Sequence, residues 1–206
     1  MSELLLLPDT TDAVALTFDD GFANFADEAL PLLADHAMKA TIFVVSDRVG
    51  LDNAWPGSND RVPILPLMDW ATLGRIAEQG LEIAAHTRSH PHLRALDDRR
   101  LEDELAGCAE AIATTLGRRP VGVAYPYGEA DTRVMLAAAR HHSWACSTFF
   151  RTLSGSDDRF AIPRLDAWYF RDPQRLAAWG TSRFRAWVWA RRKARAVRAA
   201  IRRTLA

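Results

Sequence analysis

The sequence predicts an α/β fold in which strands alternate with helices, and an irregular barrel is the form we expect for the sheet. Short apolar runs of strand type alternate with longer segments whose apolar residues recur at helical spacing. Residues with catalytic or metal-binding side chains follow the strands, where parallel α/β folds place their sites. Because these residues come from strands far apart in the chain, the strand ends must converge, as they do in a barrel.

The order of the elements follows from apolar periodicity and from helix caps. We expect strands at residues 13–16, 39–45, 81–85, 121–124 and 143–148, with helices at residues 25–38, 69–79, 96–117, 131–140 and 172–180. A strand, a helix and a second strand in succession predict a parallel pair with a right-handed crossover. Residues 160–165 are predicted as a last strand, which Pro163 confines to a sheet edge. Residues 46–68 form an irregular loop, either part of a substrate cleft or a packed surface excursion.

The composition is that of a globular protein with one main domain. The chain has 206 residues, of which 49% are hydrophobic and 25% charged. A chain of this size buries a substantial core without disulfides or structural metals. The two cysteines, Cys108 and Cys146, fall in a predicted helix and a predicted strand, so we expect core thiols and no disulfide.

The N-terminal segment lacks the features of a signal peptide. The four leucines at residues 4–7 are too few for its apolar core, Glu3 stands where a basic residue is expected, and Pro8 follows at once. No segment approaches the roughly 20 apolar residues that span a bilayer. We therefore expect a soluble, cytoplasmic protein, although a chain trimmed of its leader would look the same.

Two adjacent carboxylates, Asp19 and Asp20, stand where the first predicted strand stops, in the sequence TFDDG at residues 17–21. Neighbouring anions repel each other, so they need a cation or hydrogen-bond donors to remain ionised. Gly21 lets the backbone turn sharply just after them. The alternatives are a helix-capping or turn pair and a phosphotransfer aspartate, although acidic residues in such sites often alternate as Asp-x-Asp.

The sequence HTRSH at residues 86–90 also follows a predicted strand, and it supplies two imidazoles, His86 and His90. Histidines four residues apart reach one metal ion if the segment forms a single helical turn. One carboxylate and two histidines leave a position open for a water, which the ion acidifies, and the second aspartate then acts as base. The simpler alternative is a pair of structural histidines.

With a third segment, YPYG at residues 125–128, these motifs resemble the polysaccharide deacetylases of carbohydrate esterase family 4, the NodB-homology domain. The resemblance covers roughly residues 12–170. TFDDG matches the first motif of the family, HTRSH the second, and YPYG the core of the third. The fold that the resemblance implies is a distorted (β/α) barrel of the polysaccharide deacetylase type, here with an additional basic C-terminal helix.

The resemblance also implies the roles of individual residues. Asp20, His86 and His90 would hold a divalent metal, with zinc expected, while Asp19 is the general base and the backbone N–H of Tyr127 helps hold the oxyanion. The implied enzyme is a metal-dependent hydrolase of carbon-nitrogen bonds other than peptide bonds, which removes N-acetyl groups from a glycan. Its setting would be exopolysaccharide or cell-envelope carbohydrate metabolism. Such a reaction needs a polarised carbonyl, a strong nucleophile and donors for the developing charge.

Two features depart from the family pattern. The third motif often begins with an arginine that orients the base, and Ala124 stands there instead. Arg164, at the end of the last predicted strand, is our candidate for supplying that guanidinium. The family commonly has a late Leu-x-His that protonates the leaving amine, but no histidine follows His142. His92 lies nearest the ligands in sequence, and a metal-bound water or the substrate itself are the alternatives.

These departures keep two other functions open. One is a hydrolase that uses the same metal core on another small amide. The other is a catalytically inactive carbohydrate-binding module that retains the barrel. The missing arginine and late histidine favour the module, whereas the four intact motif residues, two aspartates and two histidines, oppose it.

The C-terminal segment is strongly basic. No acidic residue follows Asp172, and residues 181–206 are predicted as an amphipathic helix beside a deacetylase-like barrel domain of residues 1–180. The predicted apolar stripe consists of Trp187, Ala190, Ala194, Val197, Ile201 and Leu205. This stripe either packs on the barrel or makes peripheral contact with an anionic membrane surface. Nucleic acid is not expected as a partner, because basic charge alone discriminates poorly.

Overall fold

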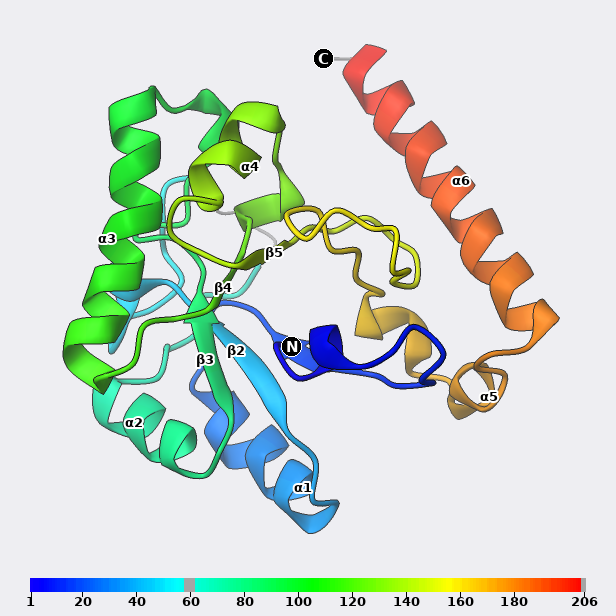
Figure 1. Cartoon of the computed structure of the whole chain (residues 1–206), viewed down its shortest axis with the longest axis horizontal. Coiled ribbons are helices and arrows are strands. Elements are labelled where there is room, and N and C mark those ends of the chain that lie inside the picture. Colours follow the sequence, from blue (N-terminus) through cyan, green and yellow to red (C-terminus); the bar gives the residue numbers. More distant parts are fainter. Residues whose placement is uncertain (58–61, 205–206) are drawn as a thin grey trace.

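A curled sheet of five parallel strands forms the centre of the computed structural model, which describes residues 1–57 and 62–204. The strands lie in the order β1-β2-β3-β4-β5, which is also their order in the chain. They are β1 (Leu16–Phe18), β2 (Ala40–Val44), β3 (Glu82–Ala85), β4 (Gly122–Ala124) and β5 (Trp144–Cys146). This sequential order of parallel strands confirms the predicted α/β class and the barrel type of sheet (Figure 1).

In the described residues, six α-helices connect or follow the strands. They are α1 (Leu30–Asp35), α2 (Trp70–Glu78), α3 (Asp98–Leu116), α4 (Thr132–Ala138), α5 (Pro173–Ala177) and α6 (Ser182–Thr204). The carboxylates of Asp69, Asp97 and Asp131 accept hydrogen bonds from backbone N–H groups in the first turns of α2, α3 and α4. Residues 25–38 do not form one helix, because a π-helical turn (Phe25–Ala29) precedes α1. Pro31, which has no N–H group, lies in the first turn of α1.

Side chains of the sheet alternate between two apolar clusters. All five residues of β2 are buried, because the strand pairs with β1 and β3 at its edges and apolar clusters cover both of its faces. Ile42 and Val44 pack with residues of α1 and α2 on the outer face. Phe43 points to the inner face, where it meets Trp144 and other buried residues. The alternation has the period of two residues that a strand imposes, so the inside of the barrel is filled.

Two predicted strands differ from the structure. The first strand is Leu16–Phe18 and not residues 13–16, since these later residues are the ones that pair with β2. Residues 160–165 contribute a single bridge, between Ile162 and Cys146. Pro163 lacks the N–H group that would extend the ladder. Among the described residues no strand joins β1 to β5, so the barrel has an open seam.

The C-terminal helix α6 packs through an aromatic cluster. Phe184 and Val188 are buried together with Phe150, and Trp187 packs against the same group. Tyr169 also belongs to this cluster. Figure 1 shows α6 on the opposite side of the molecule from α3.

The prediction of which face of α6 packs on the barrel is therefore wrong. Of its described members only Trp187 packs inward, while Ala190, Ala194 and Val197 are exposed. The side chain of Ile201, and Leu205 altogether, lie outside the described residues. Two arginines of the helix turn inward instead: the Arg191 guanidinium lies 4.7 Å from the Tyr169 ring centroid, and that of Arg195 lies 5.5 Å from the Phe150 ring centroid. The packed face differs from the predicted one because aromatic rings of the preceding segment determine which side chains of the helix are buried.

The remaining sequence predictions on the core concern cysteines and membrane spans. Cys108 and Cys146 are both free and buried, which confirms the predicted core thiols. No helix in residues 1–57 and 62–204 combines the length and the apolar character that crossing a bilayer requires.

Burial of His142 makes the stability of the fold depend on pH. Neither of its ring nitrogens has a hydrogen-bond partner among the described residues. Burial, with a smaller effect of the neighbouring His141, lowers the pKa of His142 from 6.5 to about 4. In the unfolded chain the imidazole takes up its proton near pH 6.5, so acid favours unfolding. The contribution of His142 to the free energy of unfolding is fully present above pH 6.5. It falls by up to about 3 kcal/mol as the pH approaches 4.

We predict that His142→Gln removes much of this pH dependence, because an amide does not titrate. The measurement is urea unfolding of wild type and variant at pH 7 and pH 4.5. The loss of unfolding free energy between the two pH values should be about 2 kcal/mol smaller in the variant. His36→Gln, at an exposed imidazole, is the control. Equal losses in wild type and His142→Gln would contradict the prediction.

Candidate metal centre

Both aspartates of the first motif stand at the carboxyl end of β1. The chain turns there through left-handed backbone conformations, with φ of 72° at Asp20 and 76° at Gly21. Aspartate tolerates this region better than most residues, and glycine adopts it without penalty. The Gly21 carbonyl then accepts a hydrogen bond from the Met68 N–H at 2.9 Å, which ties the turn to the start of α2. The sharp turn expected from the sequence is thus present.

The second motif forms what we call the ligand turn, residues 86–90, at the carboxyl end of β3. It is not helical: φ is 69° at Thr87 and 62° at His90. The His86 N–H donates to the Val44 carbonyl at 2.8 Å, and the His90 N–H donates to the Thr87 Oγ1 at 3.1 Å. The two imidazoles therefore approach each other, with ring centroids 4.9 Å apart, without the helical turn that the spacing suggested.

Asp20, His86 and His90 converge on one point. The Asp20 Oδ1 lies 3.3 Å from the His86 Nε2 and 3.5 Å from the His90 Nε2. Ligand atoms that bind one zinc ion tetrahedrally at about 2.0–2.2 Å lie roughly 3.3 Å apart. Among the described residues, the buried Asp20 Oδ1 has no hydrogen-bond partner, which is unusual for a buried acceptor. The donor set and its spacing fit a divalent metal such as zinc.

The Nε2 atoms of both histidines face Asp20, while the pKa values of the two rings shift in opposite directions. The His86 Nδ1 lies 2.8 Å from the Ala124 carbonyl, so Nδ1–H donates and the Nε2 lone pair faces Asp20. Burial alone would lower the pKa of His86, but the negative charges of Asp20 and Asp19 beside it outweigh burial and raise the pKa. Burial and the charge of His86 lower the pKa of His90 to about 4, which keeps this ring neutral.

Arg164 lies against Asp19 in a two-pronged ion pair. Its Nη1 is 2.5 Å from the Asp19 Oδ1 and its Nη2 is 2.9 Å from Oδ2. The same guanidinium donates to the Ser147 carbonyl and the Thr17 Oγ1, so it spans the seam between β5 and β1. Burial raises the pKa of Asp19, but the charge and hydrogen bonds of Arg164, with the two histidines, outweigh it and the net pKa is lowered. The carboxylate therefore stays ionised.

Tyr127 stands on the other side of the metal ligands, in the turn after β4. Its φ is 59°, and its ring centroid lies 4.8 Å from that of His90. His92 stacks on the outer face of the Tyr127 ring at 4.1 Å and pairs with Glu129 at 3.0 Å. The structure thus brings Tyr127 close to the ligands, whereas the role of its N–H group stays a prediction.

Residues that the sequence did not single out as site residues complete the surroundings. Trp55, from the irregular loop, is buried against His90 with ring centroids 4.3 Å apart. This contact favours the view that the loop borders the site. Ala124 contributes through its carbonyl alone, and Glu129 through its pair with His92. A backbone acceptor has no sequence signal, and a lone tryptophan in a loop has a weak one.

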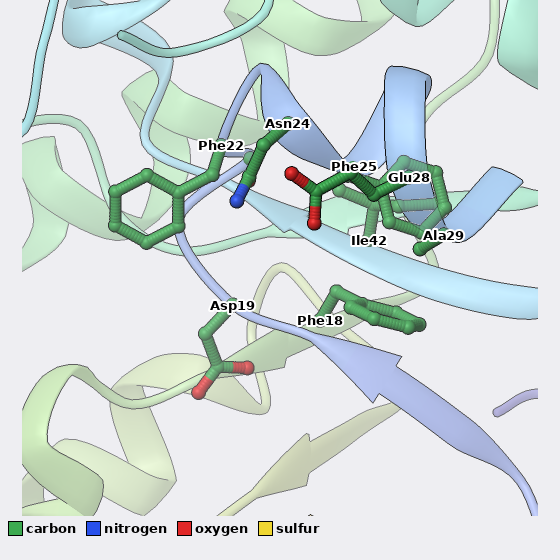
Figure 2. Close-up of a pocket in the computed structure, with 9 residues that line it drawn as sticks. Phe18, Asp19, Phe22, Asn24, Phe25, Glu28, Ala29 and Ile42 are labelled. Atoms are coloured by element: carbon green, nitrogen blue, oxygen red, sulfur yellow. The ribbon is translucent and has the colours of Figure 1, made fainter. Parts of the chain in front are cut away.

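A cavity of about 250 Å³ borders the site beside Asp19. Its walls include the rings of Phe18, Phe22 and Phe25, and the polar groups of Asn24 and Glu28 stand at the same cavity (Figure 2). The three candidate ligands do not line it. The hollow therefore lies to the β1 side of the candidate metal site and not over it.

Comparison with known proteins bears on both the sequence and the fold. The family model described as polysaccharide deacetylase matches residues 7–143. A chitin deacetylase of Pestalotiopsis is 30% identical over 113 residues, which are 55% of this chain and 33% of that protein. A peptidoglycan-N-acetylglucosamine deacetylase of Bacillus cereus is 30% identical over 117 residues, which are 56% of this chain and 36% of that protein. The chain thus spans about a third of the length of these two relatives.

The fold matches a solved structure as well. The Streptococcus pyogenes deacetylase PplD, determined in complex with acetate, superposes with a TM-score of 0.66 at 22% identity. The superposition covers 76% of this chain and 65% of the other. At this identity the likeness concerns the fold, which is the predicted (β/α) barrel of the deacetylase type. Because the family match extends over more than half of the sequence, the chain belongs to the polysaccharide deacetylase family.

Proposed function

We propose that this protein is a metal-dependent deacetylase that hydrolyses the N-acetyl groups of a glycan. The observation that carries the proposal is the convergence of Asp20, His86 and His90 beside an ion-paired Asp19, at the carboxyl ends of parallel strands. Sites of (β/α) barrels lie at this end of the sheet. Two of the relatives are named for the deacetylation of chitin and of peptidoglycan N-acetylglucosamine.

Asp20, His86 and His90 would hold the metal, with zinc as the expected ion. A bound zinc ion would supply Lewis acidity to polarise the amide carbonyl of the substrate. The Ala124 carbonyl fixes the His86 tautomer that leaves Nε2 free to bind. Burial keeps His90 neutral, which is the form that a metal requires.

Asp19 would accept the proton of the attacking water. Arg164 contacts both of its carboxylate oxygens, which fixes the plane of the group and keeps it ionised. Arg164 would in this way replace the arginine of the family's third motif, whose position Ala124 occupies in this chain. The backbone N–H of Tyr127 would donate to the oxygen that becomes negative as water adds to the carbonyl.

The two alternative functions make different demands on these residues. A carbohydrate-binding module needs no oriented carboxylate base, and the Arg164–Asp19 pair therefore favours an enzyme. A hydrolase of another small amide would use the same groups. The substrate, and not the metal site, separates that alternative from glycan deacetylation.

We predict that purified protein with added zinc releases acetate from N-acetylglucosamine oligomers. Asp19→Asn should retain zinc and lose turnover by about 10²–10⁴-fold, because the general base is gone. His86→Ala should lose both zinc and turnover, because a ligand is gone. Acetate is measured enzymatically, and zinc by metal analysis after gel filtration. Chelator-treated wild type should regain activity when zinc is returned.

Three outcomes distinguish the functions. Zinc retention without acetate release from any glycan tested would favour the binding module. Cleavage of small amides without cleavage of the oligomers would favour the other hydrolase. Full turnover in Asp19→Asn would contradict the assignment of the base.

We predict further that Arg164→Lys lowers kcat by about tenfold or more while zinc affinity is unchanged. A lysine keeps the charge, but its compact ammonium cannot reproduce the two-pronged contact with Asp19. Arg151→Lys is the control for the substitution itself, because Arg151 pairs with Asp157 outside the site, through one carboxylate oxygen. Equal kcat values in the two variants would contradict a role for Arg164 in orienting the base.

We also propose peripheral contact with an anionic membrane through the outer face of α6. This face, opposite Phe184 and Val188, consists of Ala186, Trp189, Ala190, Lys193 and Val197, all exposed. Arg185 and Arg192 flank it, and no acidic residue occurs in the helix. An exposed indole between cationic side chains suits the interface of an anionic bilayer.

We predict that wild type cosediments with vesicles containing phosphatidylserine at low salt and that Trp189→Ser with Arg192→Glu does not. Arg100→Glu, on the exposed surface of α3, is the charge-matched control and should bind like wild type. High salt should weaken binding. Removal of residues 183–206 is a poorer test, because it would uncover Phe150. Absence of binding by wild type at low salt excludes this contact, and binding to DNA alone would favour nucleic acid.

A further inference from the structure

The ligand turn carries two of the three candidate metal ligands without regular secondary structure. Thr87 and His90 both have backbone conformations of the left-handed region. For residues other than glycine this region costs about 1–2 kcal/mol each. The turn therefore keeps its shape only if contacts from outside hold it.

Glu104, on α3, accepts three hydrogen bonds from the ligand turn. Its Oε2 accepts hydrogen bonds from the backbone N–H groups of Arg88 at 2.8 Å and Ser89 at 2.9 Å. Its Oε1 accepts one from the Ser89 Oγ at 2.6 Å. The carboxylate thus caps the two residues between Thr87 and His90. Hydrogen bonds to an ionised acceptor are about twice as strong as neutral ones.

The opposite side of the turn rests on the chain that follows β2. The N–H groups of Ser46 and Asp47 donate to the carbonyls of Thr87 and Arg88 at 3.2 and 2.9 Å. The turn is therefore held on two sides, by backbone on one and by the Glu104 carboxylate on the other.

The side chain of Arg88 adds a second link to α3. It crosses the helix at Gly107, where a Cβ atom would lie 2.5 Å from the Arg88 Cδ. Its guanidinium pairs with Asp47 at 3.0 Å and with Asp103 at 2.8 Å. These pairs are partly exposed and contribute little by themselves. Glu104 remains the group that bonds the backbone of the turn directly.

We propose that Glu104 is a positioning residue that preorganises His86 and His90 for metal binding. The inference rests on the metal site of the proposed function. Among the described residues, Glu104 makes no hydrogen bond to the three candidate ligands and does not line the cavity beside Asp19. It acts through the backbone of Arg88 and Ser89, so its loss should widen the range of positions that the imidazoles take. Mutation of residues that position metal ligands without binding the metal commonly changes metal affinity by about 10–100-fold.

The test compares Glu104→Ala, Glu104→Gln and Glu102→Ala. Glu102 is the matched control because it lies on the same helix but bonds Arg140 and His141, away from the turn. Zinc affinity is measured by competition with a chromogenic chelator, and urea unfolding of the metal-free proteins reports stability. We expect Glu104→Ala to raise the Kd for zinc by about 10–100-fold. Glu104→Gln, whose amide oxygen still accepts from both N–H groups, should lose less, and Glu102→Ala should match wild type.

Amide hydrogen exchange of the metal-free proteins supplies a readout independent of zinc. The N–H groups of Arg88 and Ser89 should exchange faster in Glu104→Ala than in wild type, and at the wild-type rate in Glu102→Ala. A purely structural role would lower stability in both alanine variants and leave zinc affinity unchanged in both, which would overturn the proposal. Wild-type protein that binds no zinc would overturn the proposed function, and the role of Glu104 with it. Zinc binding of equal affinity in wild type and Glu104→Ala would overturn the role of Glu104 alone.

Discussion

The contact between Arg164 and Asp19 is the interaction on which the site depends. Two adjacent carboxylates at a strand end repel each other, and a cation has to compensate them. Arg164 provides one such charge from a segment far away in the chain, and its further bonds to Ser147 and Thr17 hold the ends of β5 and β1 together. One guanidinium thereby orients a carboxylate and bridges a seam that no strand closes in the described part of the chain. Both partners are partly buried, so loss of Arg164 would remove a compensating charge and also the two hydrogen bonds that orient the Asp19 carboxylate.

Backbone strain gathers at the same end of the barrel. Of the five described non-glycine residues with positive φ, four belong to the site: Asp20, Thr87, His90 and Tyr127. Such conformations persist only where surrounding contacts fix them. Here those contacts come from neighbouring strand ends and from α3, which packs against the sheet. The scaffold accordingly fixes the positions of the three candidate ligands, as the proposed metal site requires.

The C-terminal helix shows how packing overrides a periodic pattern. The sequence offers several apolar faces on α6, because alanines and valine recur at helical spacing along with the aromatic residues. The cluster around Phe150 and Tyr169 selects the face with Phe184 and Val188. The guanidinium groups of Arg191 and Arg195 then lie over the rings of Tyr169 and Phe150. The division of the chain after residue 180 stays a prediction, although α6 shares a cluster with residues on both sides of it.

The sequence by itself determined the local parts of this protein. The strand and helix order and the motif residues at strand ends all follow from patterns within a few residues of each other. Tertiary structure alone decided which distant groups meet them. The Ala124 carbonyl that orients His86 and the hydrogen bonds of Glu104 to the ligand turn join segments whose sequence carries no sign of the other. Arg164 is a candidate from the sequence, but only the structure pairs it with both carboxylate oxygens of Asp19. The face of α6 that packs is likewise decided by the aromatic cluster. Contacts between remote segments depend on how whole elements pack, and periodicity within one element does not encode that.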